Sequence, residues 1–148
     1  MRAFPLLISG FLLLSPLAAD AAGCVHSLGV GAGVVIRDHS KETDFSLGAD
    51  YECRKGPFFG WGAFANAIFS DPSTTVLGAP VLYFHPLRGD FYVAGSPILE
   101  LGGGRSDWGM RLSTRLPIPL GLLTLVPSAA VDFIRGGRRW WLGLGLRI

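Results

Sequence analysis

The alternation that decides the fold is clearest in residues 139–148, Arg-Trp-Trp-Leu-Gly-Leu-Gly-Leu-Arg-Ile. One set of alternate positions is apolar: Trp140, Leu142, Leu144, Leu146 and Ile148. The other set consists of Arg139, Trp141, Gly143, Gly145 and Arg147. Because successive side chains on a strand point to opposite faces, this pattern predicts a β-strand with one apolar face and one face of small and charged residues.

The same alternation recurs along the chain and predicts eight strands. They span residues 27–37, 44–53, 58–69, 75–84, 90–101, 107–117, 122–134 and 139–148. Most of these lengths are close to the roughly 9 to 11 residues that a tilted transmembrane strand needs. Clusters of Gly, Pro and polar residues separate them, including 102–106 and 117–121. We therefore expect an all-β fold, an eight-stranded antiparallel up-and-down transmembrane β-barrel.

Composition agrees with a membrane location. The chain is 49% hydrophobic and 16% charged, whereas soluble domains carry about 25% charged residues. Its 148 residues suffice for one domain. The net charge of +2 is too small to favour nucleic-acid binding.

The first 22 residues resemble a secretory signal. Arg2 precedes an apolar run from Leu6 to Leu17, and Ala19-Asp20-Ala21 offers small residues at cleavage-site spacing. We expect a cleaved signal peptide at 1–22 and a barrel domain at 23–148. The alternative is a retained membrane anchor, which would need about 20 consecutive apolar residues.

Charged residues gather on the less apolar face of the predicted strands. Four are acidic and four basic: Asp50, Glu52, Glu100, Arg111, Arg115, Asp132, Arg139 and Arg147. The lumen of an eight-stranded barrel is only wide enough for side chains, so opposite charges there can pair and fill it. The alternatives are a proton or ion path through these charges, a soluble lipocalin-like barrel with the faces reversed, and an irregular β-sandwich.

Aromatic residues cluster near the ends of the predicted strands, where a girdle at the lipid headgroups would place them. The expected girdle comprises Tyr51, Phe59, Trp61, Phe69, Tyr83, Phe91, Trp108, Phe133 and Trp140.

With this architecture, residues 27–148 resemble the small eight-stranded outer-membrane barrels, the group of the OmpA transmembrane domain, OmpX and OmpW-like proteins. Residues 139–148 are similar to the C-terminal strand that the outer-membrane insertion machinery recognises, with Ile148 where such strands commonly carry Phe. The resemblance implies an outer-membrane location in contact with lipopolysaccharide. It does not indicate an oligomeric state or a cofactor.

The two cysteines, Cys24 and Cys53, lie before the first predicted strand and at the end of the second. Both positions fall at the periplasmic rim, in an oxidising compartment, so we predict a disulfide that clips the first hairpin. The alternatives are acylation of Cys24, which follows the small residues 21–23, and free thiols. Two cysteines without clustered histidines do not predict a metal site.

Three classes of function remain open. The first is a structural or interaction barrel with a plugged lumen, the second a narrow channel or small-solute binder, and the third a lipid A-modifying enzyme. Barrels of the deacylase kind place His and Ser two apart on one strand, whereas His26-Ser27 and His39-Ser40 are adjacent here. We therefore expect the three histidines to be rim or loop residues and no catalytic residue to be present.

Overall fold

The computed structural model describes residues 23–38, 42–86, 91–135 and 137–148; the predicted signal peptide and His39-Ser40 lie outside them. The strands are β1 Val25–Arg37, β2 Thr43–Lys55, β3 Phe59–Phe69, β4 Thr74–Phe84, β5 Tyr92–Gly102, β6 Arg105–Arg115, β7 Ile118–Leu120, β8 Leu123–Ile134 and β9 Gly137–Arg147. Among these described residues no helix is long and apolar enough to cross a membrane.

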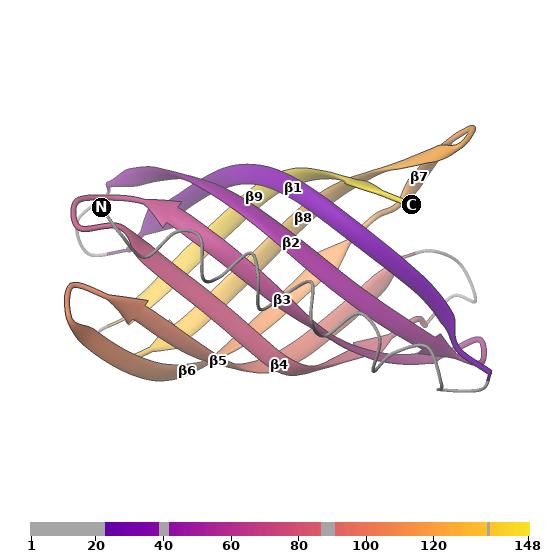
Figure 1. The fold of residues 1–148 in the computed structure, drawn as a ribbon, viewed down its shortest axis with the longest axis horizontal. Coiled ribbons are helices and arrows are strands. Elements are labelled where there is room, and N and C mark those ends of the chain that lie inside the picture. Colours follow the sequence, from indigo (N-terminus) through magenta and orange to yellow (C-terminus); the bar gives the residue numbers. More distant parts are fainter. Residues whose placement is uncertain (1–22, 39–41, 87–90, 136) are drawn as a thin grey trace.

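The strands form a closed antiparallel barrel (Figure 1). Each long strand pairs with the next along the chain, β6 pairs with β8, and β1 pairs with β9 to close the ring. The short strand β7 pairs only with β8 and lies outside the ring. Eight strands therefore build the wall, which confirms the predicted fold class.

One predicted turn is wrong. We expected 117–121 to connect two strands, but the chain continues through β7 and reverses at Gly121 and Leu122. Gly121 has φ of +71°, a conformation that glycine adopts without steric cost. Pro117 and Pro119 suggested a turn. Prolines are also tolerated on an edge strand, and β7 is one.

The wall is largely apolar outside, and its buried charged residues lie inside together with an apolar cluster. On β9, Leu142 and Leu144 are 51% and 53% exposed, whereas Trp141, next to Leu142, is 8% exposed. Large exposed apolar side chains occur on every strand of the ring, while buried charged residues face the lumen. This distribution is the reverse of a soluble lipocalin-like barrel, which hides its apolar face inside.

Tyr83 departs from the expected aromatic girdle. It is 3% exposed and belongs to the buried cluster inside the barrel. The pairing of β4 with β5 shifts register between Gly78 and Leu82, a segment that contains Pro80, which cannot donate to the ladder. Even-numbered side chains of β4 point inward before this shift and odd-numbered ones after it, so Tyr83, assigned to the girdle from its place near the strand end, points into the lumen.

Glycines allow β1 and β9 to approach closely where the ring closes. Gly33 pairs with Gly143. A Cβ atom on Gly33 would collide with the Leu142 carbonyl oxygen and lie 2.9 Å from the Gly143 Cα. Because both obstacles are backbone atoms, a side chain there would have to move the strands apart.

Gly33→Ala is therefore expected to lower the free energy of unfolding by about 1 to 3 kcal/mol. Gly95→Ala provides the matched control on β5, because its Cβ would meet only Leu112 Cδ2, at 3.7 Å. Removing that glycine's backbone freedom should stabilise the barrel by about 0.5 kcal/mol. Urea unfolding of both variants in detergent measures the difference, and equal effects would contradict it.

Candidate functional site in the barrel lumen

All eight charged residues predicted for the lumen make ion pairs with one another in the structure. They fall into two groups along the barrel. We call them the Asp132 cluster, formed by Glu100, Arg111, Asp132, Arg139 and Trp141, and the Asp50 cluster, formed by Asp50, Glu52, His85, Tyr92, Arg115 and Arg147.

Asp132 is the centre of the first cluster and is 0% exposed. It accepts two hydrogen bonds from Arg111, from Nε at 2.5 Å and from Nη2 at 2.8 Å. Trp141 Nε1 donates to Asp132 Oδ2 at 2.7 Å, and Arg139 Nη2 lies 3.3 Å from the same oxygen. Arg139 also pairs with Glu100 at 2.7 Å. Two carboxylates thus neutralise two guanidinium groups.

Two aromatic rings pack against the guanidinium group of Arg111. Its guanidinium carbon lies 4.5 Å from the centre of the Phe64 ring and 4.1 Å from that of Trp141. Guanidinium groups pack favourably on aromatic faces, and the stacking leaves their edges free to donate in the ring plane. Phe64 and Trp141 therefore fix the plane in which Arg111 meets Asp132.

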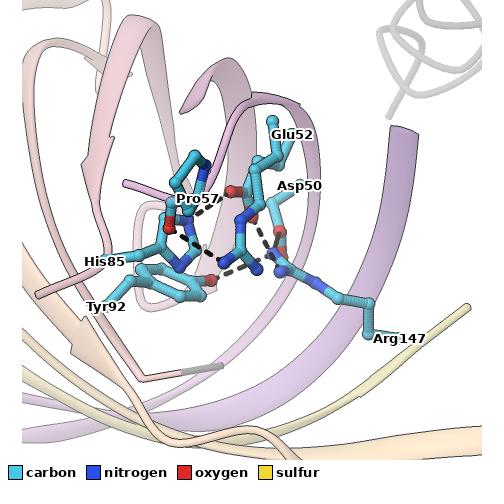
Figure 2. A network of polar contacts seen from close by, with 7 residues as sticks. Asp50, Glu52, Pro57, His85, Tyr92 and Arg147 are labelled. Carbon is cyan, nitrogen blue, oxygen red and sulfur yellow. Dashed lines mark hydrogen bonds and ion pairs between the residues drawn. The ribbon is translucent and has the colours of Figure 1, made fainter. Parts of the chain in front are cut away.

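The Asp50 cluster lies toward the end of the barrel where β1 begins and β9 ends. Figure 2 shows five of its members close together: Asp50, Glu52, His85, Tyr92 and Arg147. Asp50 accepts from Arg115 at 2.6 Å and from Arg147 at 2.9 Å. Arg147 also reaches Glu52 at 2.8 Å and the Tyr92 hydroxyl at 2.9 Å. Arg147 therefore links two carboxylates of β2 across the barrel closure from β9.

His85 is a correction to the sequence prediction, which made it an ordinary rim or loop residue. It is 1% exposed, and its Nε2 lies 2.8 Å from Glu52 Oε1. Its backbone N–H donates to the Phe58 carbonyl at 2.8 Å, which holds the segment after β4 against the turn after β2. Pro86 suggested a surface turn, but the burial of His85 shows that its side chain points inward.

Tyr92 was also missed as a site residue. Its ring lies 5.3 Å from the Arg147 guanidinium and 5.8 Å from that of Arg115, and it meets Tyr83 edge to face at 5.1 Å. Sequence alternation alone places the Tyr92 side chain on the inner face of β5, because it alternates with Phe91 and Val93. Its contacts depend on which strands meet across the lumen, which alternation does not show.

The lumen also contains a cavity of about 90 Å³ on the glycine-rich side of the wall. Among its lining residues are Gly31, Gly33, Ser46, Arg111, Arg115 and Ser128. One water molecule occupies about 30 Å³ in the liquid, and buried water needs polar partners. The cavity has room and hydrogen-bonding groups for a few water molecules between the two clusters.

The two cysteines, Cys24 and Cys53, are joined in a disulfide. Because its sulfur is in this bond, Cys24 is not the free thiol that the acylation alternative requires. At the opposite end of the barrel, Asp38 accepts hydrogen bonds from Arg138 at 3.1 Å and from Trp140 at 3.2 Å.

The described histidines do not form a hydrolase arrangement. His26 contacts the Tyr51 hydroxyl at 2.7 Å, and His85 contacts Glu52; neither contact involves a serine. Within the described ranges, groups of three or more His, Cys, Asp or Glu suited to a metal ion are not found. The charged groups of the lumen neutralise one another in ion pairs.

No protein-family model matches the chain, and no curated protein matches it in sequence. Solved structures with its fold include Neisserial surface protein A, with a TM-score of 0.64 and 12% identity over 85% of this chain and 98% of that one. Another is the N-terminal β-barrel domain of Pseudomonas aeruginosa OprF, with a TM-score of 0.63 and 10% identity over 84% and 97%. Both are small eight-stranded outer-membrane barrels. The chain therefore shares the fold of this group, as the sequence predicted.

Proposed function

We propose that the chain is an integral outer-membrane barrel with a structural or interaction role, whose lumen is closed by its two charge clusters. The observation that carries this proposal is the orientation of the wall. Large apolar side chains face outward on every strand of the ring, and the buried charges pair inside. In water such an outer surface would be a large exposed apolar area, whereas acyl chains would cover it.

Location and orientation follow from the same proposal. The predicted signal peptide would export the chain, and residues 139–148 would be recognised by the insertion machinery. Both ends of the barrel domain lie at the same end of the barrel, which we assign to the periplasm. The charged rim around Asp38 and Arg138 would then face lipopolysaccharide headgroups.

The plug is proposed because the two clusters lie in series along a narrow lumen. An ion crossing it would have to separate Arg111 from Asp132 and then Arg147 from Asp50, which are paired at 2.5 and 2.9 Å. Removing one partner of a buried pair leaves an uncompensated charge, at a cost of about 3 to 5 kcal/mol. The resting barrel should therefore not conduct.

Planar-bilayer recording of the purified, folded protein tests the plug, and cell fractionation tests the location. We expect no conductance steps, recovery with the outer membrane, and a gel mobility that changes on boiling. Recovery as a soluble periplasmic protein would overturn the location. Steady conductance steps in the unmodified protein would overturn the plug.

A narrow channel is the second candidate, and the cavity between the clusters favours it. Water there would reach Arg111, Arg115 and the serine-lined wall, so only the ion pairs would remain to be opened. Regular conductance steps that depend on salt type would support the channel over the closed scaffold.

A further inference from the structure

One hairpin extends beyond the barrel at the end where β1 begins and β9 ends. It comprises residues 116–126, with β7 on one side and the first residues of β8 on the other. Figure 1 shows it in orange, projecting past the C-terminal end of β9. The other fully described turn at this end, between β2 and β3, is short and follows Arg54 and Lys55, the last residues of β2.

The hairpin is apolar along its whole length. No Asp, Glu, Lys or Arg occurs between Arg115 and Asp132. Leu122 at the tip is 99% exposed, and Leu120 beside it is 58% exposed. An apolar ribbon of this kind is unfavourable in water, so something is expected to cover it.

The face of the hairpin that carries its large apolar side chains continues the outer surface of the barrel. Ile118 pairs with Leu125 and Leu120 with Leu123, and directly paired residues share a face. The alternation carries this face back to the exposed Leu116 and Leu112 of the wall. The surface proposed to meet acyl chains therefore runs without interruption onto the hairpin.

The free edge of β7 opposes strand addition by another chain. The Leu116 N–H donates to the Pro127 carbonyl of β8 at 3.1 Å, so alternate N–H groups, those of Ile118 and Leu120, face β8 as well. Positions 117 and 119 face the open edge, and both are proline. Because proline has no N–H, this edge lacks the donors that a second copy would need for pairing.

We propose that hairpin 116–126 is an interfacial anchor that inserts its leucine tip into the phospholipid leaflet at the periplasmic end. This inference rests on the proposed membrane location. Lipid is favoured over a protein partner because the apolar surface continues the acyl-facing wall and has no charged rim. The open carbonyl groups at the edge of β7 still require water, which places the ribbon at the boundary of headgroups and acyl chains.

Nitroxide labels on single introduced cysteines test the anchor in vesicles of phosphatidylethanolamine and phosphatidylglycerol, with the native disulfide kept oxidised. Leu122→Cys and Leu120→Cys report on the tip. Lys55→Cys is the aqueous control at the same end, and Leu144→Cys on β9 is the control for the outer wall. Collision rates with oxygen and with a water-soluble nickel complex measure the depth of each label.

We expect the oxygen-to-nickel ratio at Leu122→Cys and Leu120→Cys to exceed that at Lys55→Cys several-fold and to approach that at Leu144→Cys. A ratio equal to that at Lys55→Cys would overturn the anchor. Protection from both reagents that increases with protein density would also overturn it, because a second copy would then cover the tip. A water-exposed label at Leu144→Cys would instead show that the proposed membrane location fails.

Discussion

Asp132→Asn is expected to lower the free energy of unfolding by about 3 to 5 kcal/mol, the cost of leaving a buried charge uncompensated. Asp132 is fully buried and serves Arg111, Arg139 and Trp141 at once. Asparagine keeps the shape but removes the negative charge and turns N–H donors toward the guanidinium groups. Urea unfolding in detergent, followed by tryptophan fluorescence and gel mobility, measures the loss.

Two variants show whether charge balance is responsible. Glu42→Gln removes a rim carboxylate that is 65% exposed and 3.7 Å from Arg37, and should change stability by less than about 1 kcal/mol. Adding Arg111→Met to Asp132→Asn leaves Arg139 with Glu100 and restores neutrality, so part of the loss should be recovered. A double variant as unstable as Asp132→Asn alone would contradict this explanation.

The outer and inner faces of the barrel could be predicted because strand alternation depends only on local sequence. On β9, the exposed leucines and the buried Trp141 follow the predicted alternation. The charged residues of the lumen could be found in the same way, because a buried charge on an apolar strand requires a partner. Which carboxylate meets which arginine depends on register and shear, which no single strand encodes.

The errors occur where the alternation is interrupted. The register shift between Gly78 and Leu82 moved Tyr83 inward. It also accompanies the burial of His85, which alternation could not reveal because this residue follows the end of β4. The prolines of the β6–β8 connection suggested a turn, although proline is equally suited to the edge of an extended hairpin.

Cys24→Ser is expected to lower the free energy of unfolding by about 3 to 4 kcal/mol, because the disulfide closes a loop of 29 residues and restricts the unfolded chain. The structure also identifies where the native state should loosen. Pairing on the β9 side begins at Leu28, which exchanges two backbone hydrogen bonds with Ile148, whereas pairing with β2 extends to Val25. The first residues of β1 therefore form part of one ladder only, and the Cys24–Cys53 bond holds them at the open end of that hairpin.

Hydrogen exchange should consequently rise at residues 25–27 in Cys24→Ser and remain low at residues 30–36, which pair on both sides. Reduction of the unmodified protein is the matched control, because it breaks the same bond without changing any residue. Both treatments should give the same loss of stability and the same pattern of exchange. A loss confined to Cys24→Ser would mean that residue 24 acts through its packing, and unchanged stability after both would mean that the β1–β2 ladder alone holds the hairpin closed.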